Sequence, residues 1–306
     1  MEYPIILFTY RRIPEKTIKS LQSNKISRDS ELFIFSDGYK NEIDKKDVLE
    51  VRKYLKTIKG FKNITIIERE QNWGLAKNII KGVTEIINKY EKVIVLEDDL
   101  IVSNDFLEYM NGALEFYKDE KKIWSISGYT PPLKCLENYD RDVYISVRAN
   151  SWGWATWKDR WKTIDWDIKD WKEFKKDKKG IKRFNLGGND MFKMLELQML
   201  GKIDSWAIRW CYNQFKQYKY TVYPKCSKII NIGFDNVGTH NSTGFEKWNS
   251  NLCNNKLKIE NIELNEEILK DFKKFYDLSL KTRIGYFLRK YGGYNFVKKL
   301  GSKFLK

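Results

Sequence analysis

The chain carries three consecutive acidic residues, Glu97, Asp98 and Asp99, directly after the apolar run Val93–Leu96. Neighbouring carboxylates repel one another, so they need a compensating cation or several hydrogen-bond donors. Oxygen ligands of this kind suit Mg²⁺ or Mn²⁺, held by one or two carboxylates together with phosphate oxygens. The trio therefore predicts a divalent-metal site for a phosphorylated ligand. An exposed acidic turn is the alternative.

The trio belongs to an alternation of apolar runs and amphipathic segments near the start of the chain. Short continuous apolar runs are typical of strands buried on both faces of a parallel sheet, and apolar stripes at helical spacing indicate helices. The predicted strands are Pro4–Tyr10, Glu31–Phe35, Ile64–Ile67 and Val93–Leu96, and the predicted helices are Pro14–Asn24, Lys45–Ile58 and Gly74–Tyr90. This pattern predicts an α/β fold with an open, mostly parallel sheet flanked by helices.

Charged side chains follow three of these predicted strands. Arg11 and Arg12 come after the first strand, Asp37 after the second, and the acidic trio after the fourth. Ligands of open α/β sheets lie at the carboxyl ends of the strands, so we expect these side chains to face one site. An Asp after a strand is also a common helix or turn cap.

Beyond residue 100 the pattern is looser. We predict helices over 106–117, 191–200 and 205–218, and strands over 123–127, 144–146 and 228–232. A Trp-dense stretch occupies 152–171, and the Lys-rich run 173–182 is interpreted as a solvated face or loop.

The segment Val93–Leu100, followed by Ser103–Phe106, resembles the metal-binding motif of glycosyltransferases with the GT-A fold. The likeness is to N-acetylglucosaminyltransferase I and to bacterial family 2 sugar transferases, and it extends from about Pro4 to about Asn241. It implies an inverting, metal-dependent transferase that uses Mn²⁺ or Mg²⁺. The implied donor is a nucleotide-sugar, with UDP as the first choice, and the acceptor is a hydroxyl of a saccharide or a lipid-linked glycan.

The resemblance also implies roles for the acids. Asp99 is expected to be the direct metal ligand, and Glu97 and Asp98 are expected to face the sugar or ribose of the donor. Asp37 resembles the acid that reads the edge of the base, which suits a carboxylate that accepts a hydrogen bond from uracil.

Basic and polar residues are expected to meet the donor phosphates. Arg11 or Arg12 resembles the residue that contacts the nucleotide phosphates. The segment 72–78 resembles the start of a donor-site helix, where main-chain N–H groups and Lys77 could face phosphate, with Asn78 beside it. The alternative is that Lys77 and Asn78 are ordinary surface residues of a first helical turn.

The Trp-dense stretch resembles the segment that shapes the sugar pocket in these enzymes. Trp152 and Trp154 are expected to be pocket walls, whereas the spacing of Trp157 and Trp161 favours the core. His240 follows the last predicted strand in a Gly-rich loop that could close over the donor diphosphate, although a lone His is often structural.

The reaction needs a carboxylate base to take the proton of the acceptor hydroxyl. Asp204 lies where these families carry their catalytic Asp, although it could also cap the helix that begins near Ser205. Asp190 is the second candidate, and Asp165 and Asp167 are weaker ones.

The composition narrows the class further. There is one His, and the four Cys (135, 211, 226 and 253) include no Cys-x-x-Cys pair, which argues against a zinc site. No signal peptide and no apolar run long enough to span a membrane are recognised. We therefore expect a cytoplasmic protein with reduced thiols.

The net charge is +16, and half of it falls within 281–306, which holds eight Lys and Arg and no acid. Residues 1–263 are interpreted as the transferase domain and 264–306 as a basic, amphipathic helical tail. Such a tail can lie on an anionic membrane surface, so we expect a peripheral enzyme on the inner face of the membrane, as in bacterial surface polysaccharide biosynthesis. The alternative is a C-terminal helix that packs on the domain.

Other classes fit less well. A sugar nucleotidyltransferase or a dinucleotide-dependent oxidoreductase needs a Gly-rich phosphate loop after a strand, and Thr9–Pro14 contains no Gly. A nucleic-acid-binding protein could use the excess of Lys, but no such motif is found and the acidic trio would repel phosphate. No nucleic-acid partner is therefore expected.

Overall fold

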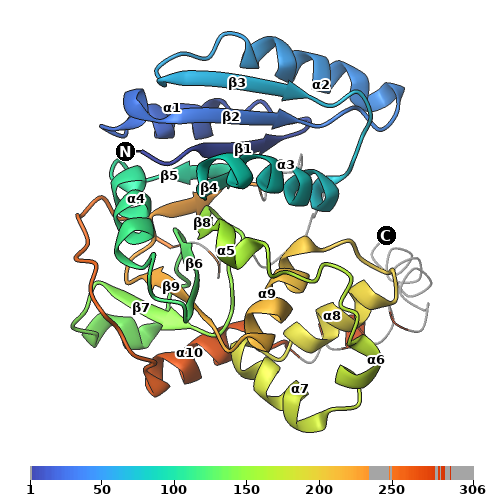
Figure 1. Ribbon diagram of the computed structural model, residues 1–306, viewed down its shortest axis with the longest axis vertical. Helices are drawn as coiled ribbons and strands as arrows, with labels where there is room; N and C mark the ends of the chain where they lie inside the picture. The colour runs from blue at the N-terminus through green and yellow to red at the C-terminus, as the bar shows by residue number, and fades with distance from the viewer. Residues whose placement is uncertain are drawn as a thin grey trace, which may run out of the picture.

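The structure is a computed structural model that describes residues 2–233, 248, 250–279, 282, 284–286 and 290. One eight-stranded sheet, in the order β3-β2-β1-β4-β8-β6-β9-β7, organises it (Figure 1). A two-stranded ladder of β10 and β5 completes the strands of the described part of the chain.

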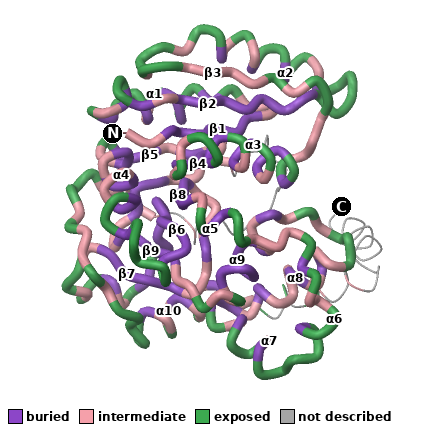
Figure 2. Tube along the Cα trace, viewed as in Figure 1, coloured by how far each residue is buried: buried purple, intermediate pink, exposed green. Residues whose placement is uncertain are grey.

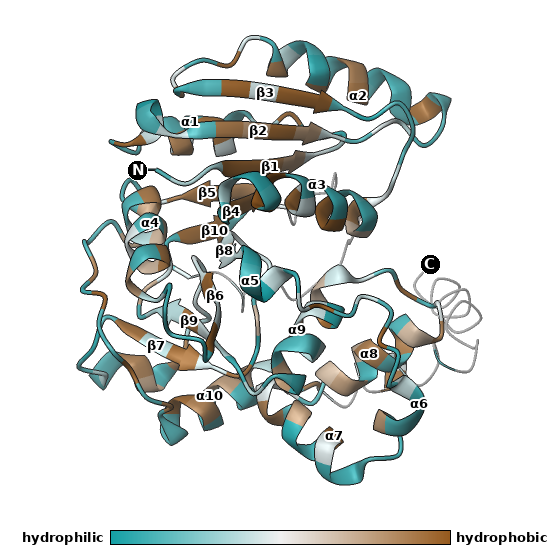
Figure 3. Cartoon of the chain, viewed as in Figure 1, coloured by the Kyte–Doolittle hydropathy of each residue, from teal (hydrophilic) through white to brown (hydrophobic). Residues whose placement is uncertain are grey.

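The first half of the sheet is parallel, as predicted. It consists of β1 (Ile5–Thr9), β2 (Glu31–Ser36), β3 (Asn63–Glu68) and β4 (Lys92–Glu97). Every residue of β1 is buried, because helices cover both faces of the sheet. β1 is correspondingly apolar, whereas β2 and β3 begin with hydrophilic residues (Figure 3).

The helices divide between the two faces of the sheet. One apolar core contains side chains of α1 (Glu15–Gln22), α2 (Glu42–Leu55) and α4 (Phe106–Phe116). The other contains side chains of α3 (Leu75–Tyr90), α5 (Lys158–Trp161), α8 (Met191–Met199) and α9 (Trp206–Lys216). Alternate residues of β1 point into the two cores, Ile5 and Leu7 into the first and Ile6 and Phe8 into the second.

The second half of the sheet is mixed. β8 (Trp154–Trp157) pairs antiparallel with β4 and β6 (Ile123–Ser127), β9 (Tyr220–Pro224) is parallel to β6, and β7 (Val143–Ser146) is antiparallel to β9. β5 (Leu100–Val102) pairs with β10 (Ile229–Asn231). The strands β6, β7 and β10 were predicted, whereas β5, β8 and β9 were not.

The Lys-rich run forms short helices on the outside of the molecule. These are α6 (Trp171–Phe174) and α7 (Lys178–Phe184), whose exposed surface is visible in Figure 2. Phe174 and Phe184 are buried beneath them and anchor them, while the Lys side chains face solvent. The prediction of a solvated face is confirmed.

The predicted tail does not begin as a separate segment. Helix α10 (Glu266–Tyr276) packs at the β7 end of the sheet (Figure 1). Ile268 and Phe272 share an apolar cluster with Tyr144 and Tyr223. Residues 264–277 are therefore integral to the fold, and most of the basic residues beyond them lie outside the described residues.

The cysteines correct one expectation. Cys226 and Cys253 form a disulfide bond, whereas Cys135 and Cys211 do not. The expectation that all thiols are reduced is therefore wrong for this pair, which lies far apart in the sequence and is brought together only by the fold. Among the helices of the described segments, none has the length and apolar character needed to traverse a lipid bilayer.

Candidate active site

The acidic trio lies at the carboxyl edge of the parallel sheet, joined to the end of β1. Phe8 of β1 pairs with Glu97 of β4. The main-chain N–H of Tyr10 donates to Asp98 Oδ2 over 3.2 Å, and the hydroxyl of Thr17 donates to the Asp98 carbonyl over 3.0 Å. The ends of β1 and β4 therefore form one surface, as the sequence predicted.

Asp99 is held from the other side by the segment that follows β10. The N–H of Ile232 donates to the Asp99 carbonyl over 2.8 Å. Gly233 is so close that a Cβ on it would lie 2.1 Å from Asp99 Oδ2. The chain then enters the predicted closing loop, whose His240 lies outside the described residues.

Burial and mutual repulsion raise the pKa values of Glu97 and Asp98. Burial, followed by the charge of Asp99, raises the pKa of Asp98 to about 7, although Thr9, Tyr10 and Arg12 partly oppose the shift. The pKa of Glu97 lies well above its ordinary value, first because of burial and then because of Asp99 and Asp98. A bound cation would relieve both effects.

The trio fits a divalent ion only as an open site. Nowhere in the described part of the chain do three Asp, Glu, His or Cys side chains converge to enclose an ion. An ion at Asp99 would therefore take its remaining oxygens from a diphosphate and water, which is the usual arrangement for Mg²⁺ with nucleotides. The residues present fit that kind of metal binding.

The structure separates the two candidate phosphate-binding arginines. Arg11 pairs with Asp44 of α2 at 2.5 Å, and the hydroxyl of Tyr10 donates to the same carboxylate over 2.8 Å. Arg12 instead lies beside the trio, with its Nε 4.0 Å from Asp98 Oδ1. Arg12 is therefore the arginine that lies at the acidic trio, and its contact with a diphosphate stays a prediction.

Asp37 organises the loop that leads into α3. Its buried carboxylate accepts hydrogen bonds from the N–H groups of Trp73 and Gly74 over 2.8 and 3.0 Å, and from Asn72 Nδ2 over 3.2 Å. Asp37 thus supports this loop, and its contact with a base stays a prediction. The adjoining Gly38 lies against the main chain of Gln71, where a Cβ would approach the carbonyl carbon to 2.4 Å.

The two predicted residues in the first turn of α3 differ in exposure. Lys77 is exposed, with its ammonium 4.8 Å from the centre of the Trp73 ring. Asn78 is buried and accepts a hydrogen bond from Arg69 Nε over 3.4 Å. Arg69 lies over the same Trp73 ring at 4.1 Å. Lys77 can reach a ligand, whereas Asn78 supports the arginine.

The tryptophans divide between a pocket and the core. Trp154 is only 1% exposed and packs against Trp161, Trp206 and Trp210 at ring distances of 5.7, 5.2 and 4.2 Å. The expectation that Trp154 lines a sugar pocket is therefore wrong. Trp157 and Trp161 are buried, as predicted.

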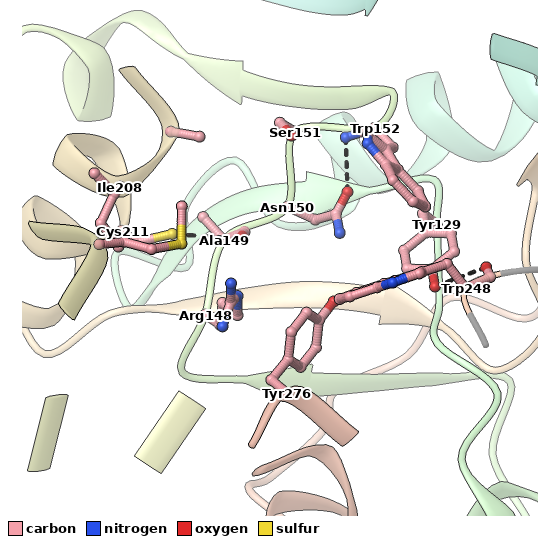
Figure 4. Close-up of a pocket in the computed structure, with 12 residues that line it drawn as sticks. Tyr129, Arg148, Ala149, Asn150, Ser151, Trp152, Ile208, Cys211, Trp248 and Tyr276 are labelled. Carbon is pink, nitrogen blue, oxygen red and sulfur yellow. Dashed lines mark hydrogen bonds between the residues drawn. The ribbon is translucent and has the colours of Figure 1, made fainter. Parts of the chain in front are cut away.

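Trp152 lines a pocket of about 170 Å³ (Figure 4). The β4–β8 ladder pairs Val95 with Trp154, so the chain before β8 runs past the end of β4. The 148–152 segment forms one wall and the first turn of α9 forms another, with Trp248 and Tyr276 closing the pocket. Of these lining residues, the sequence predicted Trp152 alone.

The candidate bases have different surroundings. Asp190 is buried and accepts two hydrogen bonds of 2.8 Å from Arg148. Asp204 has a side chain that is 67% exposed and contacts Arg209 at 3.3 Å. Ser205 is the N-cap of α9, because its hydroxyl accepts from the N–H of Ile208 over 3.3 Å. Asp204 is therefore not the cap, and it directly precedes the turn that lines the pocket.

The weaker candidates stabilise a loop. Asp165 accepts hydrogen bonds from the N–H groups of Asp167 and Lys169 over 3.1 and 2.8 Å. Both aspartates belong to this local turn, and none of their recorded contacts reaches the trio.

Sequence reasoning missed most of the pocket. Arg148 and Asn150 precede Trp152 by a few residues and could have been included with that segment. Trp248 and Tyr276 come from distant parts of the chain, and no local pattern signals their position.

A mostly parallel sheet with an acidic trio at its carboxyl edge, an arginine beside the trio and an adjoining aromatic pocket defines a glycosyltransferase with the GT-A fold. The sequence matches the GNT-I family over residues 5–183, more than half of the chain. The chain belongs to the GNT-I family. This match includes the trio and Trp152 but ends before Asp204.

An individual relative and two solved structures show partial likeness. An alpha-1,3-mannosyl-glycoprotein 2-beta-N-acetylglucosaminyltransferase of Arabidopsis thaliana is 27% identical over 124 residues, which are 37% of this chain and 26% of that protein. The match thus spans about a quarter of that relative.

A mannosyltransferase from Pyrobaculum calidifontis, solved with GDP-Man and Mn²⁺, superposes with a TM-score of 0.39 and 16% identity over 52% of this chain and 45% of that one. The galactosyltransferase LgtC, solved with donor and acceptor sugar analogues, gives a TM-score of 0.36 and 12% identity over 69% of each chain. These superpositions are loose, and the assignment depends on the family match and the observed topology.

Proposed function

We propose that the chain transfers a sugar, with inversion, from a nucleoside-diphosphate donor to a hydroxyl of a saccharide or lipid-linked glycan. UDP-sugar is the first choice of donor. The observation that carries this proposal is the acidic trio itself, which is half-buried and lies between the end of β1 and Gly233, with the pKa values of Glu97 and Asp98 raised.

The expected contacts with the donor follow from the charges of the residues around the trio. Asp99 would hold the divalent ion, Mn²⁺ or Mg²⁺, which when bound supplies positive charge against the diphosphate leaving group. Arg12 lies 4.0 Å from Asp98 and would contact phosphate oxygens. Lys77 at the start of α3 is a second cation within the loop that Asp37 organises. Glu97 and Asp98 would then accept hydrogen bonds from sugar or ribose hydroxyls.

The transfer step requires one base. The acceptor oxygen attacks the anomeric carbon, the bond from that carbon to the diphosphate breaks, and the nucleoside diphosphate leaves. The proton of the acceptor hydroxyl passes to the Asp204 carboxylate. Asp204 supports this role because it is accessible and precedes the pocket-lining turn of α9.

The cellular location is a separate prediction. A basic tail favours an anionic membrane surface, as in surface polysaccharide assembly in bacteria. The Cys226–Cys253 disulfide favours an oxidising compartment over the cytoplasm that the sequence suggested.

Nucleotide binding tests the function directly. Thermal unfolding should be measured with UDP, GDP, ADP and CDP, each with and without Mn²⁺. We expect UDP with Mn²⁺ to raise the midpoint, by the equivalent of about 2.7 kcal/mol at a hundredfold excess over Kd. The Asp99→Asn variant should keep its fold and lose the increase in the unfolding midpoint that depends on Mn²⁺. Metal-independent binding, or none, would refute the donor assignment.

A further inference from the structure

We propose that the pocket of Figure 4 is an acceptor subsite that takes one uncharged sugar ring. This inference rests on the proposed transferase function and adds the chemical class of the group that the pocket binds. The pocket is formed by the 148–152 segment, the first turn of α9, Tyr129, Trp248 and Tyr276.

Aromatic rings form most of one side of the pocket. The Trp152 ring lies 4.6 Å from that of Tyr129 and 6.1 Å from that of Trp248, and Trp248 lies 5.3 Å from Tyr276. Trp152 and Trp248 remain partly exposed. Rigid rings with an accessible apolar surface suit the C–H faces of a pyranose, and they lose little conformational entropy on binding.

The pocket carries no net charge. Among the described residues that line it, Arg148 is the one Lys, Arg, Asp or Glu. Both terminal nitrogens of Arg148 donate to Asp190 over 2.8 Å, and its guanidinium lies 4.0 Å from the centre of the Tyr276 ring. The carboxylate of Asp190 therefore neutralises the arginine. A uronic acid or a phosphorylated sugar would find no uncompensated cation here.

Polar groups remain for the hydroxyls of a neutral sugar. Asn150 Oδ1 accepts from the N–H of Trp152 over 2.7 Å, and the Asn150 side chain also hydrogen-bonds the Tyr276 hydroxyl. Figure 4 shows the Asn150 amide between Trp152 and Tyr276. The volume of about 170 Å³ is sufficient for a single sugar ring.

The position favours the acceptor over the donor. The nucleotide-facing groups lie at the ends of β1, β2 and β4, whereas the pocket lies beyond β4 on the β8 side. Ala207 and Ile208 line it and follow Asp204, the proposed base, within one helical turn. Trp248 and Tyr276 lie outside residues 5–183, which match the family.

Ligand-observed saturation-transfer NMR tests the subsite with the full chain in the presence of UDP and Mn²⁺. The probes are methyl glycosides of glucose, galactose, mannose and N-acetylglucosamine, with methyl glucuronide as the charged counterpart. We expect at least one neutral glycoside to bind, and the glucuronide to bind at least about tenfold more weakly than that glycoside because its carboxylate would be desolvated without a partner.

Two variants locate the binding. Asn150→Ala and Tyr276→Phe each remove a polar group of the pocket. Each should weaken binding of the neutral glycoside by about fivefold or more. Tyr218→Phe is the matched control, since Tyr218 is 67% exposed and outside the pocket, and it should bind like the parent. Thermal unfolding and UDP affinity report whether each variant is folded.

Three outcomes would overturn the subsite: no glycoside binds, the glucuronide binds as well as the neutral probes, or the folded variants bind unchanged. A parent chain that binds no UDP would instead refute the transferase function. The two failures are distinguished because the nucleotide and the glycosides are measured separately.

Discussion

The main chain of Gly233 passes directly over the carboxylate of Asp99. A Cβ at residue 233 would lie 2.1 Å from Asp99 Oδ2, far inside van der Waals contact. The N–H of Ile232 holds the two segments together by donating to the Asp99 carbonyl. The position of the predicted metal ligand is therefore set by a segment far along the chain, after β10.

Substituting Gly233 tests this relationship. Gly233→Ala should push the Asp99 carboxylate aside and weaken Mn²⁺-dependent UDP binding by about tenfold or more, the loss of roughly 1.4 kcal/mol. Gly112→Ala, on helix α4, is the control. A Cβ at residue 112 would meet only the flexible end of the Ile259 side chain, at 3.0 Å. Isothermal calorimetry at several Mn²⁺ concentrations measures the affinity for UDP. An unchanged Kd for UDP would show that Gly233 does not position the metal ligand.

The two neighbouring arginines should behave differently. Arg12→Ala removes the cation beside Asp98 and should weaken UDP binding by at least about tenfold, since a charge-assisted hydrogen bond contributes roughly 1.5–3 kcal/mol. Arg11→Ala breaks the pair with Asp44 and should leave UDP affinity within about twofold while lowering stability slightly. Equal effects on UDP binding would contradict the assignment.

The sequence predicted the donor half of the site because its signals are local. Runs such as Val93–Leu96 are buried on both faces of the sheet, and the residues after each strand must lie at the same edge. Arg12 and the trio meet for that reason. The separate orientation of Arg11 could not be predicted, because it depends on Asp44 in a helix packed beside it.

The pocket half could not be predicted because its contacts are tertiary. The resemblance of the Trp-dense segment to a sugar-pocket segment applies equally to Trp152 and Trp154, so it made them equivalent candidates. Gly153 adopts a φ of 54°, which turns the chain before β8, so Trp154 enters the core while Trp152 faces the pocket. The pairing of Arg148 with Asp190 likewise carries no local signal.

Thiol labelling tests the disulfide. Burial raises the pKa of Cys211 to about 11, and burial with Asp271 raises that of Cys135 to about 12. A raised pKa lowers the thiolate fraction at pH 8, so the native protein should react slowly. Denatured without reductant, the chain should label at two cysteines, and after reduction at all four. Four reactive thiols before reduction would show that the disulfide does not form.

Truncation tests the basic tail, and it also removes the 2.7 Å ion pair between Lys290 and Glu196 of α8. Asp277 accepts a hydrogen bond from the N–H of Asn189, and the N–H of Leu278 donates to Asn189 Oδ1, so a truncated chain should end after Ser279. We expect this chain to lose sedimentation with anionic vesicles, since each basic residue contributes about 1 kcal/mol near such a surface. Unchanged sedimentation, or binding to neutral vesicles alone, would refute a membrane role of the tail.

Replacing each candidate base by the corresponding amide should change a different property, turnover for Asp204 and stability for Asp190. Asp204 is exposed and not a helix cap, so Asp204→Asn should leave stability within about 0.5 kcal/mol and UDP binding unchanged while abolishing transfer. Asp190 neutralises the buried Arg148, so Asp190→Asn should lower the free energy of unfolding by about 3 kcal/mol or more.

Denaturant unfolding, UDP calorimetry and turnover, measured on both variants, separate these roles. Turnover can be measured with the neutral glycosides as acceptors. If Asp204→Asn retains turnover, Asp204 is not the base, and if Asp190→Asn is stable but inactive, the proton acceptor is Asp190. A catalytic carboxylate must reach the acceptor hydroxyl, and the buried Asp190 carboxylate is occupied by two hydrogen bonds from Arg148, whereas that of Asp204 is exposed.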